Sequence, residues 1–320
     1  MNKSTGRLVL ASIAGFSLFA AACGDDDKTT TEPPVEDLSG EIFIDGSSTV
    51  TPLISLVAED FQIANPGVQV PVGTSGTGGG FEKFCAGETD ISMASRPIKD
   101  EEAAICEEAG IVPVEFIVAN DALSLIVNPD NDWAACLTVE QLATMWGAEA
   151  DGTVNNWNQI DPAFPDQELI LFGAGSDSGT FDYFTDEING EAGVIRTDYN
   201  PSEDDNVTIT GVAGDTGAVG FLGLSYVLEN ADKVKAVAVD SGDGCVDPSA
   251  DTVIDGSYTP LGRPLFIYFK AESLGRAEVK AFADFFVANQ DELIVEALFI
   301  PLNDEQKAKQ QEELAAVDAA

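Results

Sequence analysis

Three segments of the sequence combine closely spaced hydroxyl side chains with glycines. They are 45–50 (Asp-Gly-Ser-Ser-Thr-Val), 73–80 (Gly-Thr-Ser-Gly-Thr-Gly-Gly-Gly) and 175–180 (Gly-Ser-Asp-Ser-Gly-Thr). Hydroxyl groups donate hydrogen bonds, and glycine lets the backbone approach a ligand closely. Where such a segment leads into a helix, the unpaired N–H groups and the positive end of the helix dipole add to these donors. The combination suits a small tetrahedral oxyanion.

A fourth segment, 94–98 (Ala-Ser-Arg-Pro-Ile), places Ser95 beside the guanidinium of Arg96. Arginine binds oxyanions through two parallel hydrogen bonds, and this chain contains only 15 Lys and Arg residues. One glycine- and hydroxyl-rich loop alone is more often a plain turn, and an isolated Arg96 is more often a surface ion-pair partner. Four such segments in one chain favour an anion-binding site.

The composition excludes several kinds of catalytic centre. The sequence contains no histidine, which removes Ser-His-Asp and Cys-His mechanisms and every His-ligated metal. Segment 73–80 lacks the Gly-Lys-Ser/Thr ending of a phosphate-binding P-loop, and 175–180 lacks the spacing of a nucleophile elbow. The acidic segment 240–251 does not match a calcium-binding loop. We therefore expect a binding protein rather than an enzyme, with neither a cofactor nor a resident metal.

The chain of 320 residues is strongly acidic, with 15 Lys and Arg against 56 Asp and Glu, a net charge of −41. Such a surface disfavours nucleic acid and anionic membranes as partners. It does not exclude an anion as ligand. At about 0.15 M salt the Debye length is about 8 Å, so remote carboxylates are screened while donors in a closed cleft are not.

The amino terminus is typical of an exported protein. Lys3 and Arg7 precede an apolar run, and small residues lead to Cys23, which Gly and Asp residues follow. The pattern predicts a signal peptide at 1–22 and lipid attachment at Cys23, with 23–40 as an extended linker. The alternative is an ordinary signal peptide in which Cys23 has no role. We expect an extracytoplasmic monomer that contacts the membrane only through its lipid anchor.

Four further cysteines suggest disulfides, because their number is even and the protein is exported. Three pairings are possible. We prefer Cys85–Cys106 with Cys136–Cys245, because each bridge then stays within one predicted domain.

Apolar periodicity predicts alternating strands and helices, which is the pattern of an α/β protein with largely parallel sheets. The predicted strands are 41–45, 68–72, 90–94, 112–118, 123–127, 169–172, 234–239 and 265–269. The predicted helices are 51–61, 81–85, 100–109, 138–145, 180–188, 279–287, 292–299 and 304–316. Thr51 is expected to cap the first helix, and Thr138 with Gln141 forms a capping box.

The order of motifs resembles a known family. The lipidation signal is followed in order by G-S-S-T-V-x-P, G-T-S-G-T-G-G-G, T-D-I-x-x-A-S-R-P-I, D-S-G-T-F-D-Y-F and S-E-D-D-N-V, and the match runs from about residue 40 to about residue 301. This is similar to the phosphate-binding proteins that serve high-affinity phosphate ABC transporters, in the branch with the S-R-P-I sequence. The resemblance implies the two-lobed type II periplasmic-binding-protein fold, with a mixed, largely parallel sheet in each lobe and two hinge crossovers. The lobes would be 41–119 plus 253–320, and 120–252.

The resemblance also implies a function and a set of site residues. Inorganic phosphate would be captured between the lobes and delivered to the permease subunits of an ABC transporter. The implied ligands are the matching positions Ser47, Ser48, Thr49, Thr77, Ser95, Arg96, Ser178, Gly179 and Thr180. The alternatives are another tetrahedral oxyanion, such as sulfate or molybdate, and an exported phosphate-ester hydrolase.

Two departures from the best-known branch leave part of the site open. Arg96 stands where that branch has an aspartate that accepts the phosphate proton, and Ala174 stands where it has an arginine. Asp45 and Asp177 are the candidates for the proton acceptor. Sulfate has no proton to give near neutral pH, so selectivity against it requires such a carboxylate. Arg196 is either a further ligand or a partner of nearby acids.

Overall fold

A single mixed sheet runs through the part of the chain that the structure, a computed structural model, describes, which is residues 38–176 and 178–318. The predicted signal peptide, Cys23 and Asp177 lie outside these residues. The strand order is β2 (Ile44–Gly46), β4 (Ile91–Ala94), β12 (Gly262–Lys270), β5 (Pro113–Val127), β9 (Ala218–Gly223), β7 (Ile170–Ala174) and β8 (Asn200–Ser202). Strand β10 (Lys235–Asp240) pairs with β5, β6 (Cys136–Thr138) and β11 (Cys245–Val246), and β1 (Gly40–Glu41) pairs separately with β3 (Val68–Gln69).

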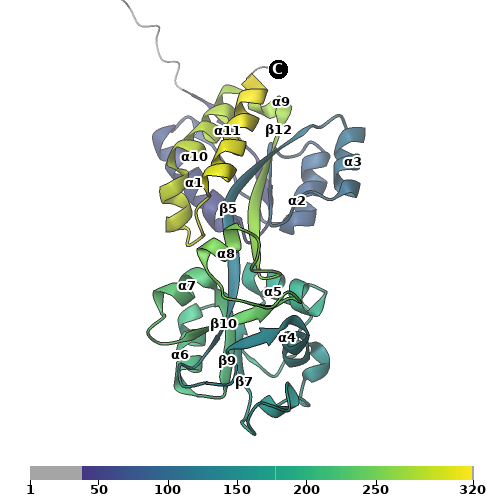
Figure 1. Ribbon diagram of the computed structural model, residues 1–320. Helices are drawn as coiled ribbons and strands as arrows, with labels where there is room; N and C mark the ends of the chain where they lie inside the picture. The colour runs from purple at the N-terminus through teal and green to yellow at the C-terminus, as the bar shows by residue number, and fades with distance from the viewer. Residues whose placement is uncertain (1–37, 177, 319–320) are drawn as a thin grey trace, which may run out of the picture. The chain divides into compact units, whose positions relative to one another are not determined.

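The pairing confirms an α/β fold with a mixed sheet. Strands β2 and β4 are parallel, as are β7 with β8 and β7 with β9. The two central strands, β5 and β12, are antiparallel to each other and to their outer neighbours β9 and β4. Figure 1 shows β5 and β12 running side by side, with helices on either side of the two strands.

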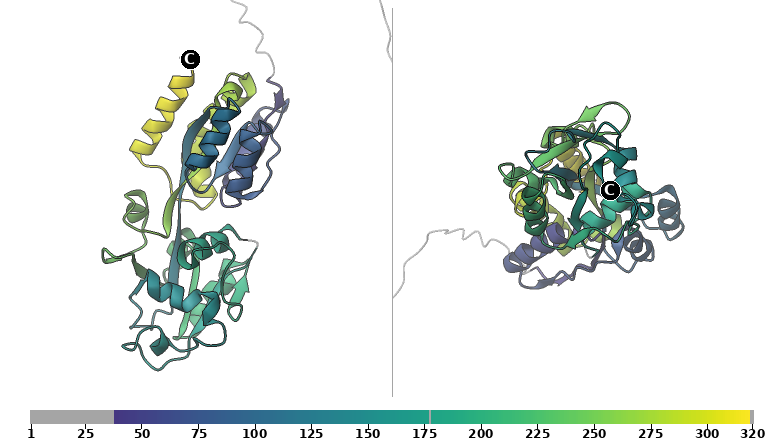
Figure 2. Two further views of the ribbon diagram at one scale, coloured as in Figure 1. Left: turned by 90° about the vertical axis from the view of Figure 1, so that its right-hand side faces the viewer. Right: turned by 90° about the horizontal axis from the view of Figure 1, so that it is seen from below.

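The residues of β12 show how the sequence builds a sheet that is covered on both faces. Successive side chains of a strand point to opposite faces. Leu265, Ile267 and Phe269 enter one core, which also holds apolar residues of α1 (Thr51–Ala64) and α10 (Ala277–Glu296). Phe266 and Tyr268 enter a second core, formed with α2 (Gly76–Cys85) and α3 (Asp100–Glu108). The helices accordingly lie on both sides of the strands (Figures 1 and 2).

A third core is formed mainly by the stretch of sequence that runs from the end of β5 to the start of β12. It holds apolar side chains from Ala122 to Leu261 together with Ile300, and Trp146, Trp157 and Phe221 are fully buried in it. Its helices are α4 (Val139–Trp146), α5 (Gly179–Asn189), α6 (Asp205–Gly214), α7 (Leu224–Glu229) and α8 (Ala250–Ile254). The predicted second lobe coincides with most of this core. Val253, Tyr258 and Leu261 also belong to it, although they lie past the predicted boundary at 252.

Several predicted elements differ in extent from those observed. The predicted strands 112–118 and 123–127 are one strand, β5, and the predicted helices 279–287 and 292–299 are one helix, α10. Polar residues between the apolar runs led to both divisions, and tertiary pairing overrides them. The polar terminal helix is α11 (Asp304–Asp318), and the short helix α9 (Ala271–Leu274) follows β12. The strands and α-helices that were not predicted are β6, β8, β9, β11, α6, α7, α8 and α9.

Two local predictions test the capping rules. At α4, Thr138 Oγ accepts from Gln141 N at 3.1 Å and Gln141 Oε1 accepts from Thr138 N at 2.9 Å, which confirms the capping box. The expected cap at Thr51 is wrong, because Val50 occupies the N-cap position and makes no side-chain capping bond. The Thr51 hydroxyl donates instead to Ser47 O at 2.9 Å.

Both predicted disulfides are present. Cys85–Cys106 joins α2 to α3, and Cys136–Cys245 joins β6 to β11 across 109 residues of sequence. The chain-entropy estimate for loops of these lengths is about 3 to 4.7 kcal/mol of stabilisation for each bridge. Among the described residues, no helix combines the length and the apolar composition of a membrane span.

Candidate anion-binding site

All four segments singled out in the sequence lie where a strand leads into a helix, as an anion site requires. Residues 47–50 connect β2 to α1, and 175–178 connect β7 to α5. Residues 70–75 lead from β3 to α2, and 95–99 lead from β4 to α3. Loops at the carboxyl ends of parallel strands are the usual ligand-binding positions in α/β sheets.

The first segment is held tightly against the sheet. Ser47 is buried, and its N–H donates to Met93 O at 2.9 Å. Gly46 has φ of 143°, and a Cβ there would lie 2.1 Å from Met93 O, so only glycine fits. Pro52 stands in the first turn of α1, where its missing N–H costs nothing. Val50 provides no side-chain cap, and the N–H of Thr51 donates to Ser47 O at 3.1 Å.

The second and fourth segments are joined by hydroxyl groups. Thr77 Oγ accepts from Ser95 N at 3.1 Å and lies 3.0 Å from Ser95 Oγ. The N-cap residue of α2, Ser75, makes no side-chain capping bond. These contacts hold the first turn of α2 against the residues that follow β4.

The third segment comes from the core between the central strands and approaches the first segment closely. Ser178 caps α5, with its Oγ accepting from Thr180 N at 3.2 Å. Gly179 faces Thr49: a Cβ on Gly179 would lie 2.7 Å from Thr49 Oγ and 3.1 Å from Thr49 N and Cα. The absence of a side chain at Gly179 is therefore what permits this approach.

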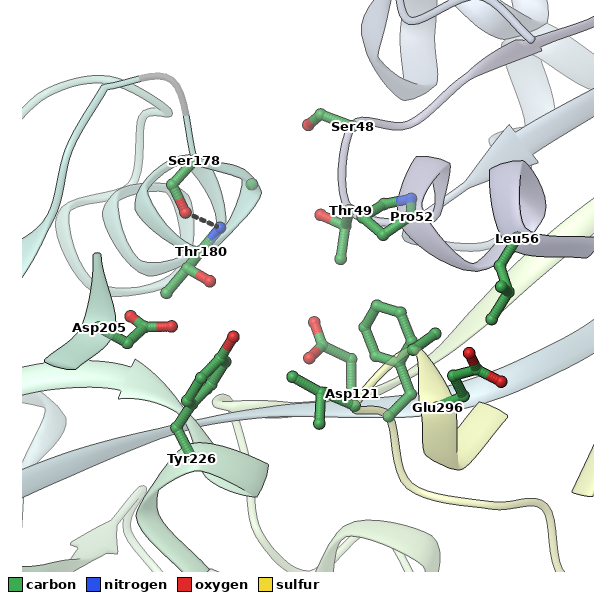
Figure 3. A pocket seen from close by; sticks show the side chains of 15 residues that line it. Ser48, Thr49, Pro52, Leu56, Asp121, Ser178, Thr180, Asp205, Tyr226 and Glu296 are labelled. Carbon is green, nitrogen blue, oxygen red and sulfur yellow. Dashed lines mark hydrogen bonds between the residues drawn. The ribbon is translucent and has the colours of Figure 1, made fainter. Parts of the chain in front are cut away.

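Two cavities meet at this approach and share Ser48, Thr49 and Gly179. We call the smaller one, of about 230 Å³, the guanidinium cavity, because Arg96 and Arg263 line it together with Ser47, Thr77 and Ser95. The larger one, of about 540 Å³, is the carboxylate cavity, lined by Ser178, Thr180, Asp121, Asp205 and Glu296. Figure 3 shows Ser178 and Thr180 on one side of the carboxylate cavity and Ser48 and Thr49 on the other. All nine predicted ligand residues thus line one or both cavities.

Arg96 lies in the guanidinium cavity with its charge already balanced. Its Nη1 and Nη2 donate to the two carboxylate oxygens of Glu102 at 2.8 and 2.7 Å, and Nη1 also donates to Pro97 O. Its guanidinium stands 5.7 Å from the centre of the Phe81 ring. The hydrogen bonds to Glu102 raise the pKa of Arg96, which remains a cation at any physiological pH.

Sequence reasoning missed Arg263, the second cation of this cavity. It lies on β12 directly opposite Asp121 of β5 in the strand register. No local motif marks it, since the surrounding Leu-Gly-Arg-Pro-Leu reads only as the start of a strand. Its place in the cavity depends on the pairing of strands that are more than a hundred residues apart in sequence.

Three carboxylates of α5 were also missed. Asp182, Asp186 and Glu187 line the guanidinium cavity. Burial raises the pKa of Asp182, and Asp186 raises it further. The spacing 182, 186 after the Ser-Gly-Thr turn was the available signal, because residues four apart share one face of a helix.

The carboxylate cavity holds a second acid of unusual pKa. Burial, together with the neighbouring charges of Asp204 and Glu203, raises the pKa of Asp205 to about 6. Burial also raises the pKa of Asp121, although Arg263 opposes this shift.

Two of the remaining candidates lie elsewhere. Asp45 is not among the residues that line the two cavities; Lys83 and Ser75 bind its carboxylate at 2.6 and 2.5 Å. Burial alone would raise the pKa of Asp45, and these two hydrogen bonds lower it overall.

Arg196 is a structural residue. It is buried, with Nε and Nη2 donating to Asp198 at 2.5 and 2.8 Å and Nη1 donating to two backbone carbonyls. The hydrogen bonds from Arg196 lower the pKa of Asp198 to about 2. Within the described chain, no group of three or more Cys, Asp or Glu side chains is arranged to hold a metal ion.

Comparison with known proteins gives a consistent result. Residues 29–290 match the model of the PBP superfamily domain. Protein SphX of Synechocystis is 44% identical over 83% of this chain and 80% of its own length. The phosphate-binding protein PstS of Staphylococcus saprophyticus is 39% identical over 85% of this chain and 81% of its own length. A possible phosphate-binding protein from Planctomyces limnophilus has a crystal structure that superposes with a TM-score of 0.84 at 45% identity, covering 88% of this chain and 99% of that one.

Proposed function

The chain belongs to the PBP superfamily, and we propose that it is a substrate-binding protein that captures inorganic phosphate and delivers it to the permease of an ABC transporter. Its relatives PstS and SphX, and the phosphate transport receptor of Vibrio cholerae (26% identical, TM-score 0.67), support this assignment. We further propose that it acts outside the cytoplasm as a monomer, anchored by lipid at Cys23, and that its two lobes close around the ligand.

One observation carries the proposal. Donors from segments that belong to different cores meet at Ser48, Thr49 and Gly179, and two guanidinium groups line the adjoining cavity. The hydroxyl and amide hydrogens there match the four oxygens of a tetrahedral anion. The local arrangement outweighs the net charge of −41, because remote carboxylates are screened over about 8 Å.

The carboxylates of α5 fit the protonated form of the ligand. Monohydrogen phosphate carries one proton that a carboxylate accepts, whereas sulfate carries none at neutral pH. A carboxylate facing sulfate finds no proton to accept and repels the anion. We propose Asp182 as the acceptor, because it stands in the first turn of α5 and lines the guanidinium cavity. Asp177 remains a second candidate, and the hydrogen bonds of Asp45 to Lys83 and Ser75 argue against the third.

Equilibrium dialysis with labelled phosphate tests the function. We expect saturable binding that a hundredfold excess of sulfate does not displace. Displacement by equimolar sulfate or molybdate would reassign the ligand, and turnover of a chromogenic phosphate ester would reassign the class to a hydrolase. Absence of saturable phosphate binding would overturn the proposal.

Three variants separate the candidate acceptors in the same assay. Asp182→Asn should lower the preference for phosphate over sulfate by about tenfold or more, since an amide cannot accept the proton in the same way. Asp45→Asn is the matched control and should leave this preference unchanged. Should Asp177→Asn alone reduce it, Asp177 is the acceptor.

A further inference from the structure

The two arginines of the guanidinium cavity differ in how fully the protein already uses them. Arg96 donates three hydrogen bonds within the protein, two to the Glu102 carboxylate and one to Pro97 O, all between 2.7 and 3.0 Å. A guanidinium with a bidentate carboxylate partner is electrically balanced and geometrically fixed. Its charge is therefore only partly available to a ligand.

Arg263 lacks such a partner. Its Nε is buried and makes no hydrogen bond within the described chain. The nearest carboxylate oxygen, Asp121 Oδ2, lies 3.6 Å away, which is beyond hydrogen-bond range. Among the residues that the structure describes, its only hydrogen bond to another side chain is a long one, from Nη2 to Thr49 Oγ at 3.4 Å. Buried donors without acceptors are rare and destabilising, so we expect a ligand to supply an acceptor for the Arg263 guanidinium.

The surroundings of Arg263 fix its guanidinium in place. The guanidinium carbon lies 3.3 Å from the centre of the Tyr183 ring, and the Tyr183 hydroxyl donates to Pro260 O at 2.7 Å. The Arg263 side chain is only 17% exposed. Stacking on an aromatic face leaves the in-plane N–H groups free to point at a ligand. The group is thus held ready before an anion arrives.

Resting on the proposed function, we propose that Arg263 is the guanidinium that pairs with the bound oxyanion and that Asp121 is the carboxylate it leaves when the anion binds. Arg263 contacts Thr49 of the first segment and Tyr183 of α5, and it stands on β12. An anion bound to Arg263 would therefore link the first segment and α5 through one residue of β12. Asp121 and the anion compete for the same cation.

Calorimetric titration of the full chain with inorganic phosphate tests this role. Arg263→Gln should weaken phosphate binding by about 30-fold or more, the cost of removing one partner from a buried charge pair. Arg96→Gln should weaken it less, because Glu102 already shares that charge. Wild-type-like affinity of Arg263→Gln, beside a wild type that binds phosphate, would overturn the inference alone. A wild type that binds no phosphate would overturn the proposed function and this inference together.

A second variant keeps the test decisive if Arg263→Gln folds poorly, which thermal unfolding would reveal. Asp121→Asn removes the competing charge at nearly constant volume. It should tighten phosphate binding by about threefold to tenfold when Arg263 is present, and by less than twofold in the Arg263→Lys background, where a bidentate pair cannot form. Equal tightening in both backgrounds, or none in either, would overturn the inference.

Discussion

The guanidinium cavity and the carboxylate cavity share three residues and differ in that only the first is lined by arginine. Ser48, Thr49 and Gly179 line both. Arg96 and Arg263 line the first together with Asp182, Asp186 and Glu187 of α5, whereas Asp121, Asp205 and Glu296 line the second, which has no Lys or Arg among its described lining residues. An anion at the shared donors thus has carboxylates in both cavities but guanidinium groups in one of them only. The contrast shows how a protein of net charge −41 concentrates two cations beside the donors of one site.

The largest effect is expected where the two cavities meet. A Cβ on Gly179 would press on the backbone of Thr49 at 3.1 Å, so Gly179→Ala should separate the two segments. Overpacking costs about 1–3 kcal/mol, which corresponds to a loss of phosphate affinity of about 5- to 150-fold. Titration calorimetry measures this loss. Gly214→Ala is the control, because a Cβ there meets nothing within 4 Å, and it should bind as the wild type does. Unchanged affinity of Gly179→Ala would mean that the two segments need not approach.

A smaller loss of phosphate affinity is expected from a substitution that changes the guanidinium cavity alone. Thr77→Val keeps the shape of a residue that lines the guanidinium cavity and removes the hydroxyl that contacts Ser95. Losing one hydroxyl hydrogen bond to a charged ligand costs about 1–2 kcal/mol, so phosphate affinity should fall about 5- to 30-fold. The exposed Thr144→Val on α4 serves as control in the same dialysis assay. A loss no larger than that of the control would place the anion outside the guanidinium cavity.

The smallest effect on binding is expected in the carboxylate cavity, where Asp205→Asn should act mainly on stability. Because the pKa of Asp205 is raised to about 6, the folded state holds the proton more tightly than the unfolded chain. Stability therefore falls as pH rises from about 4 to about 6 and stays lower above that range. Asp205→Asn should be more stable than the wild type by about 1–2 kcal/mol at pH 8, a value that allows for solvent screening of this half-buried group.

Denaturant unfolding at several pH values checks this prediction. The difference in unfolding free energy between Asp205→Asn and the wild type should disappear below about pH 4, where both side chains are neutral. Glu296→Gln, which removes another carboxylate of the same cavity, is measured beside it as the matched control. A difference that is independent of pH would mean that the Asp205 carboxyl is not the source.

The sequence predicted those parts of the site that depend on neighbouring residues. The loops before α1, α2 and α5 follow from runs of Gly, Ser and Thr between a strand and a helix, and the capping box at Thr138 follows from a spacing of three. The disulfides followed from their number and from keeping each bridge within one domain. The assignment of the three loops to two lobes came from the family resemblance as much as from the apolar periodicity.

What the sequence did not predict depends on contacts across long separations. Arg263 and Asp121 meet only because β12 pairs with β5 in one register. Strand β5 was divided at Asn120 and Asp121, since polar residues in the middle of an apolar run usually indicate a turn. In the folded chain Asp121 lines the carboxylate cavity, whereas Asn120 exchanges hydrogen bonds with Gln306 and donates to Pro301 O. The departure from the apolar pattern therefore marked a cavity residue and a tertiary contact rather than a loop.

The ladder between β5 and β12 has a consequence for which changes of length this protein tolerates. Arg263 faces the site because it stands opposite Asp121, and a slip of one residue turns every side chain of a strand to the other face. The ladder already absorbs one register shift, between Leu265 and Phe266. A further insertion or deletion in either strand that no bulge absorbs would exchange the apolar faces and turn the Arg263 side chain away from the site. We therefore expect these two strands to tolerate changes of length less well than surface turns do.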